Sequence, residues 1–202
     1  MRVEVKWHED MWQEIKDDAM FTVHKENGRY PDSKWKSDIL MSEHSPIRLL
    51  EFDWTWKPIE YWVSTEWSRH KFEKFISTQR DDRLIDETPR GKKPQEAPVT
   101  FDGFANMQNL IDAWRKRMCT CATPEARAYG ESFKYELHKT HPNEANMLVP
   151  NCVYRGGCPE FADCGFWKGF VSRNTCFDLL ELHARYARYN EEFYERVGKK
   201  YE

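Results

Sequence analysis

The segment from 50 to 56 constrains the fold of this chain more than any other. Apolar and polar side chains alternate along it, with Leu50, Phe52, Trp54 and Trp56 on one face and Glu51, Asp53 and Thr55 on the other. A period of two is typical of a β-strand with one buried face. We therefore expect the aromatic face of this strand to belong to the hydrophobic core.

The rest of the chain contains more helix than strand. Alternation at Val3, Val5 and Trp7 predicts a first strand, and 72–78 predicts a further one. The segment 81–99 is rich in proline and charge and is expected to be a long loop. Apolar side chains at helical spacing predict helices over 11–23 after Asp10, through 39–41, and over 58–67 with Pro58 in the first turn. The same spacing predicts later helices over 107–118 and from Thr123-Pro124 onward. A last helix is predicted from a stripe of Phe177, Leu180, Ala184, Ala187 and Tyr194. Early strands and late helices indicate an α+β fold.

Length and charge exclude several classes of protein. The chain has 202 residues, which predicts a single domain over 1–202. Lysine and arginine total 31 against 34 acidic residues, so bulk positive charge does not hold this protein to nucleic acid. No apolar run approaches the roughly 20 residues that cross a bilayer, and the start lacks a signal-peptide core. We expect a soluble, cytoplasmic protein without a membrane partner.

The chain contains six cysteines, whose side chains could react or bind a metal. Without an export signal they are better interpreted as thiols or metal ligands than as disulfides. Three of them lie in a loop at 151–169 that is rich in Cys, Gly and Pro. Zinc prefers four soft ligands, and the expected set is Cys121, Cys152, Cys158 and Cys164. Buried, unliganded thiols are the alternative, and an iron–sulfur cluster is less favoured.

Three short motifs follow one another between 42 and 83: Ser45-Pro46 in a polar turn, Arg69-His70-Lys71 after an apolar helix, and Thr78-Gln79-Arg80. Their order and approximate spacing resemble the flavin-dependent thymidylate synthases (ThyX). The hallmark of that family, R-H-R-x-x-S-x-N-E-x-S-x-R, follows an H-x-[ST]-P-x-E turn. Further on, Val149-Pro150 with Tyr154 looks like the family's L-P segment, so the resemblance covers most of the chain and is to a divergent, phage-type member.

The resemblance implies a fold, a reaction and an assembly. The fold would be a single ThyX-like domain, with a small antiparallel sheet packed against helices and a helix-rich C-terminal half. The reaction would move a one-carbon unit from methylenetetrahydrofolate to C5 of dUMP, using FAD reduced by NADPH. The family builds each active site from several subunits, so a homotetramer is implied.

The resemblance also implies roles for individual residues. The cofactor would be bound by Ser45, Arg69, His70 and Lys71. The nucleotide would be bound by Glu66, Thr78, Arg80 and Tyr154. Arg80 would be the catalytic cation that polarises the uracil or holds its phosphate.

Several positions depart from the family pattern. The spacing from Arg69 to Arg80 is one residue shorter than in the hallmark, Glu66 stands where the family has Gln, and Asn146 stands where it has Arg. These departures leave two other hypotheses open. One is a different flavin-dependent C5 modification of a pyrimidine nucleotide, such as hydroxymethylation. The other is a metal-stabilised module that binds a nucleotide or nucleic acid without catalysis.

Overall fold

A four-stranded antiparallel sheet underlies the part of the chain that the structure describes. The computed structural model describes residues 2–26, 28–83 and 88–201. The strands are ordered β1-β2-β4-β3. Their bounds are Arg2–Trp7 for β1, Glu51–Glu60 for β2, Glu73–Ile76 for β3 and Pro98–Asn106 for β4. The sheet therefore pairs the two strands expected at 2–7 and 50–56 as direct neighbours.

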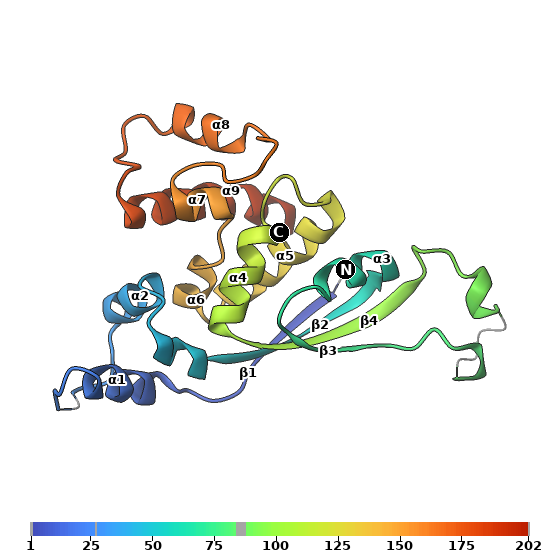
Figure 1. Cartoon of the computed structure of the whole chain (residues 1–202), viewed down its shortest axis with the longest axis horizontal. Coiled ribbons are helices and arrows are strands. Elements are labelled where there is room, and N and C mark those ends of the chain that lie inside the picture. The colour runs from blue at the N-terminus through green and yellow to red at the C-terminus, as the bar shows by residue number, and fades with distance from the viewer. Residues whose placement is uncertain (1, 27, 84–87, 202) are drawn as a thin grey trace.

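Helices cover one face of the sheet and continue away from it (Figure 1). The first ones are α1 (Trp12–Phe21), α2 (Ser33–Met41) and α3 (Tyr61–Trp67), with a 3-10 turn η1 (Ser45–Leu49) before β2. The later ones are α4 (Met107–Arg117), α5 (Pro124–His138), α6 (Pro142–Asn146), α7 (Asn151–Arg155), α8 (Phe166–Arg173) and α9 (Leu182–Tyr201). Among the described residues, none of the helices combines the length and the apolar character needed to cross a membrane. The α+β class, the small antiparallel sheet and the helix-rich C-terminal half are confirmed.

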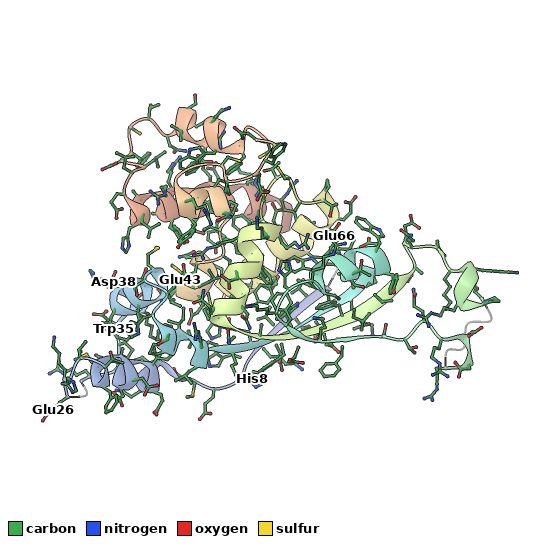
Figure 2. All side chains as sticks on the ribbon, viewed as in Figure 1. His8, Glu26, Trp35, Asp38, Glu43 and Glu66 are labelled. Carbon is green, nitrogen blue, oxygen red and sulfur yellow. The ribbon has the colours of Figure 1, made fainter. Side chains whose placement is uncertain are left out.

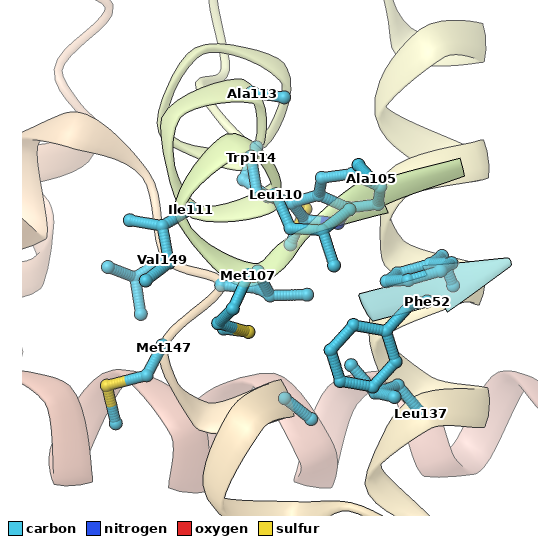
Figure 3. Close-up of a cluster of buried hydrophobic side chains, with 14 of the residues drawn as sticks. Phe52, Ala105, Met107, Leu110, Ile111, Ala113, Trp114, Leu137, Met147 and Val149 are labelled. Carbon is cyan, nitrogen blue, oxygen red and sulfur yellow. The ribbon is translucent and has the colours of Figure 1, made fainter. Parts of the chain in front are cut away.

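The aromatic face of β2 lies at the centre of the core, as its alternation predicts. Trp54 and Trp56 are fully buried, and the Trp54 ring meets the rings of Trp114 on α4 and Phe133 on α5 at centroid distances of 6.1 and 5.3 Å. Figure 3 shows the neighbouring part of this core, where side chains of α4 pack over β2 and β4. Stacked aromatic and aliphatic side chains thus join the sheet to α4 and α5.

No strand is predicted for residues 98–106, but they form β4, so this prediction is wrong. β4 pairs with both β2 and β3, and its alternate residues Val99, Phe101 and Ala105 are buried. Gly103 interrupts the apolar pattern because it lies directly opposite Trp54 in the sheet. A Cβ atom at that position would stand 2.2 Å from the Trp54 ring. The indole ring therefore requires glycine on the neighbouring strand. Because glycine is not counted as an apolar side chain, the alternating pattern of β4 is not recognisable in the sequence.

Pro58 does not begin a helix, contrary to its prediction. It lies inside β2 after a cis Lys57–Pro58 peptide bond, where the pairing register with β4 shifts between Trp56 and Ile59. Proline has no N–H to donate to the ladder, so a strand accepts it at such an irregularity. The helix begins three residues later, at Tyr61.

The final helix begins later than its predicted stripe, and another of its faces is buried. Phe177 and Leu180 precede α9 and are exposed. The buried side chains of α9 include Tyr186, Tyr189, Phe193 and Val197, together with the polar Arg185 and Asn190. Arg185 is buried because its guanidinium donates to the carbonyl oxygens of Val153 and Tyr154 on α7. Periodicity alone did not allow for an arginine on the core side.

Two connecting segments position candidate functional residues. Between β3 and β4 the chain extends beyond the end of the sheet (Figure 1), and we call its described residues, 77–83 and 88–97, the arm. The arm contains the 3-10 turns η2 (Asp81–Arg83) and η3 (Arg90–Lys92). The Cys-rich segment 151–169 begins with α7 and ends inside α8, so only 156–165 is irregular.

Candidate functional site

The Arg69-His70-Lys71 motif follows directly on the end of α3. His70 is half-buried, whereas Arg69 and Lys71 are exposed on either side of it. The imidazole is held by Arg117, the last residue of α4, whose Nε donates to His70 Nε2 at 2.8 Å. The motif therefore presents two cations to solvent around a fixed histidine.

Glu66 completes this cluster from the last turn of α3. Arg117 donates to the Glu66 carboxylate at 3.1 Å and to its backbone oxygen at 2.6 Å. The Thr123 hydroxyl donates to the same carboxylate at 3.1 Å. The Glu66 carboxylate and Arg117 therefore neutralise each other's charge. Their hydrogen bonds also orient the arginine that holds His70.

The surroundings keep His70 neutral. Burial, and secondarily the charges of Arg117 and Lys74, lower the pKa of His70 to about 4. At neutral pH the ring then carries a single proton, and Nε2 accepts a hydrogen bond from Arg117. The proton is thereby assigned to Nδ1, which makes that atom a donor for a neutral or anionic ligand group.

A second polar cluster lies on the other side of α4, where Figure 2 labels Glu43. Arg115 forms a two-pronged ion pair with the Glu43 carboxylate, and Gln108 donates to the same carboxylate at 2.8 Å. The Arg115 guanidinium lies 3.5 Å from the centroid of the Tyr154 ring and also hydrogen-bonds Tyr186. Tyr154, a predicted nucleotide ligand, is thus placed as a support for Arg115.

A cavity of about 440 Å³ lies beside this second cluster, lined by residues of α2, α5, α6 and α9. Tyr186 forms part of its wall, and so do Asn146 and Tyr194. The Asn146 Oδ1 atom and the Tyr194 hydroxyl are buried and have no hydrogen-bond partner among the described residues. Unpaired buried polar atoms are costly. Almost no surface of these two atoms is accessible, so a ligand in the cavity would reach them only after neighbouring side chains move.

A larger cavity, of about 1170 Å³, lies between α5, α8 and α9, and its walls are strongly charged. Its acidic residues neutralise most of its cations. Glu131 pairs with Arg127 and Arg196, while Glu192 pairs with Arg173. Most of the positive charges in this larger cavity are therefore neutralised by acidic side chains. Its size alone does not make it a better anion site than the end of α3.

The predicted nucleotide ligands Thr78 and Arg80 lie on the arm. β3 pairs Ile76 with Phe101 of β4, so residues after 76 run away from the end of the strand nearest His70. Arg80 donates to both oxygens of the Asp82 carboxylate, at 2.9 and 2.5 Å, and is exposed. Within one chain the structure does not bring Arg80 together with the Arg69 motif.

Ser45 lies at the start of η1, two residues beyond Glu43, and is exposed. It is therefore associated with the Glu43 cluster and not with His70. The predicted site residues fall into three separate places: the end of α3, the second cluster with its cavity, and the arm.

The predicted metal ligands gather around the ends of α4 and α7. In the ranges 2–26, 28–83 and 88–201, no group of three or more Cys, His, Asp or Glu side chains is arranged to hold a metal ion. All six cysteines are free thiols.

Solved structures share this architecture. ThyX from Helicobacter pylori complexed with FAD and dUMP matches with a TM-score of 0.59 and 12% identity, over 74% of this chain and 100% of that chain. This chain has the ThyX fold. The UMP/dUMP methylase PolB from Streptomyces cacaoi, bound with 5-Br dUMP, matches with a TM-score of 0.56 and 12% identity, over 72% and 94%. No protein-family model matches the sequence, and no curated protein does.

A second Helicobacter pylori ThyX structure, with FAD and dUMP, aligns with the ThyX fold of this chain at a TM-score of 0.55 and 11% identity, over 75% and 99%. Two arginines of the site, Arg115 and Arg117, were not predicted from the sequence. Both lie in the last turn of α4, where basic residues usually complement the helix dipole in solvent. Their positions two residues apart, which direct them to opposite sides of the helix, were the available signal.

Proposed function

We propose that this protein is a flavin-dependent thymidylate synthase, which transfers a one-carbon unit from methylenetetrahydrofolate to C5 of dUMP with FAD reduced by NADPH. One observation carries the proposal: on a ThyX fold, a neutral His70 is fixed by Arg117 between the exposed cations Arg69 and Lys71. The residues that resemble the family's flavin motif thus have a geometry suited to a ligand.

The cluster fits the chemistry of FAD. Arg69 and Lys71 would bind its phosphates through charge-assisted hydrogen bonds, and His70 Nδ1 would donate to a polar atom of the cofactor. The bound flavin supplies the redox chemistry. The protein's residues bind and orient it, and Glu66 acts indirectly by positioning Arg117.

The second cluster and its cavity fit a pyrimidine. Asn146 Oδ1 is an acceptor and the Tyr194 hydroxyl is a donor or acceptor, and both lack partners. A uracil ring offers an N–H group and carbonyl oxygens that would complement this pair once neighbouring side chains move to expose the two atoms. In this proposal Tyr154 supports Arg115, and Ser45, two residues after Glu43 in the chain, is exposed.

Arg80 and Thr78 would act on a neighbouring copy. The arm projects beyond the sheet of its own chain (Figure 1), so its residues are better placed for a site on another subunit. In a homotetramer, Arg80 would leave Asp82 and supply the cation that polarises the uracil or holds its phosphate. Thr78 would add a hydroxyl next to it.

The test is to incubate the FAD-loaded protein with dUMP, methylenetetrahydrofolate and NADPH, and to measure the mass of the nucleotide. Replacement of the C5 hydrogen by a methyl group adds the mass of one methylene group to the nucleotide. A mass gain of this size supports thymidylate synthesis. No gain with any pyrimidine nucleotide would reject catalysis and leave a binding module as the remaining hypothesis.

Asn146 favours a second candidate, a C5 modification of a different pyrimidine nucleotide. The resemblance gives the family an arginine at this position, so a charge-assisted contact is absent here. A solved relative in fold is described as a UMP/dUMP methylase. Repeating the assay with UMP and dCMP distinguishes the candidates, because a larger gain with one of them, or a gain of hydroxymethyl size, identifies the alternative reaction.

A further inference from the structure

β3 forms one edge of the sheet, and in the part of the chain that the structure describes it pairs with β4 alone. An edge strand leaves a row of backbone N–H and C=O groups with which another strand can pair. The Ser77 N–H donates to the Thr100 carbonyl oxygen at 2.9 Å, so by alternation along the strand Phe75 also directs its backbone groups toward β4. The backbone groups of Lys74 and Ile76 therefore face the free edge.

The side chain of Phe75 lies on the face of the sheet that the helices leave open. It is 73% exposed, and the residue opposite it on β4 is the exposed Asp102. The other edge strand, β1, exposes the charged side chains of Glu4 and Lys6. An exposed aromatic ring gains free energy when a second apolar side chain covers it. The ring therefore distinguishes the β3 edge as the one suited to a contact.

We propose that two copies of this chain pair through their β3 edges, around a two-fold axis that passes between the two Phe75 residues. Strands related by such an axis are antiparallel, and the helix-covered faces of the two sheets lie on the same side. Lys74 of one copy then lies opposite Ile76 of the other, and the two pairs of this kind exchange about four backbone hydrogen bonds. The two Phe75 rings meet on the open face, at the position where the strands approach most closely.

The side chains favour this register over the neighbouring ones. A shift of two residues is the smallest that keeps the helix-covered faces on one side. In one direction it would place Lys74 opposite Lys74 of the second copy, and like charges directly opposite each other are destabilising. In the other direction it would place Phe75 opposite Ser77. Only the proposed register brings the two exposed aromatic rings directly together.

The same register brings the arm of one copy to the Arg69-His70-Lys71 motif of the other, and the role of this contact rests on the proposed function. Continued beyond the ends of β3, the antiparallel pairing places Arg80 of one copy beside His70 of the second. In its own chain Arg80 is exposed and pairs with Asp82. Next to the second copy it would join the two exposed cations of the motif in binding one anionic ligand.

The test is site-specific cross-linking, which requires neither FAD nor activity. In F75C the two new thiols would lie opposite each other at a pair whose Cα atoms are about 4.5 Å apart, a separation that a disulfide can span. After incubation with oxidised glutathione we expect most of the F75C protein to be a covalent dimer, with two copies of the tryptic peptide 75–80 joined at residue 75. The matched control is F21C, because Phe21 on α1 is 79% exposed and lies outside the sheet. F21C and the unaltered protein, which has six cysteines of its own, should not form a comparable dimer.

A charge at the same position gives an independent measurement. F75K would place two ammonium groups opposite each other across the axis and weaken the pairing, while the exposed position leaves the packing of each chain unchanged. In analytical ultracentrifugation F75K should form a smaller assembly than the unaltered protein, and the control F21K should not.

Three results would overturn the proposal: an unaltered protein that sediments as a monomer, a full-sized F75K assembly, or cross-linking of F75C no greater than that of F21C. Neither experiment measures FAD binding or nucleotide modification. A failure of this interface is therefore distinguishable from a failure of the proposed function.

Discussion

Arg117 donates its Nε proton to His70 Nε2 across 2.8 Å, and this one contact links the end of α4 to the motif at the end of α3. It fixes both the ring orientation and the tautomer of the histidine. The two cations that flank the ring are left free to meet an anionic ligand. The candidate flavin site therefore depends on an arginine outside the motif.

The neutral state of His70 makes stability depend on pH. Its pKa is about 4 in the folded protein and ordinarily 6.5, so between these values the unfolded chain binds more protons. Stability should fall as pH falls from about 6.5 to 4, by no more than about 3 kcal/mol from this half-buried group. Burial also lowers the pKa of His138 and His141, which add to the same trend.

Urea unfolding at several pH values measures this effect. We expect the variant H70Q, whose amide oxygen can still accept from Arg117, to lose less stability than the unaltered protein between pH 6.5 and 4.5. Equal losses in the two proteins would show that His70 is not held neutral by its surroundings.

Gly103 and Gly198 should respond in opposite ways to alanine. In G103A the new methyl group would meet the Trp54 ring at 2.2 Å, and we expect a loss of about 3 kcal/mol or more in the free energy of unfolding. In G198A, on α9, no atom lies within 4 Å of the added Cβ. The helix should gain up to about 1 kcal/mol. Thermal melting of the two variants side by side checks both values, and an unchanged melting temperature in G103A would contradict the described packing.

Much of the fold could be predicted from the sequence, but the parts that failed share a cause. The strand at 50–56 and the helix at 107–118 were found because their side chains follow a local period. β4 was missed because Gly103 is required by the ring of Trp54, a residue 49 positions away in the sequence. The buried face of α9 was misplaced because Arg185 satisfies carbonyl groups of α7. Local patterns do not contain such long-range requirements.

Of the candidate site, only the Arg69-His70-Lys71 motif could be predicted from the sequence. Arg69, His70 and Lys71 were identified from their resemblance to a family, and the structure places them on one short segment after α3. It does not place Arg80 or Thr78 beside them, because the arm carries both away. Whether a second chain completes the site depends on assembly, which a single sequence does not describe.

The shared site has a direct genetic test. R80A should abolish turnover when made alone, and R69A should lower it severely at an FAD concentration that does not saturate the variant. If the two residues serve one site from different subunits, co-expression of the two variants should form mixed assemblies in which some sites contain both arginines. Partial recovery of nucleotide methylation in the mixed assemblies is the expected result. Activity no higher than that of either variant would contradict a site shared between subunits.

Titration of FAD into cofactor-free protein determines whether the Arg69-His70-Lys71 segment binds this cofactor. Visible absorption and calorimetry should show one FAD bound per chain. R69A should bind FAD at least about tenfold more weakly, because a charge-assisted hydrogen bond to phosphate contributes roughly 1.5–3 kcal/mol. The control K139A, at an exposed lysine paired with Glu136 at the end of α5, should bind FAD normally. No FAD binding by the unaltered protein, or an unchanged affinity in R69A, would show that this segment does not bind FAD.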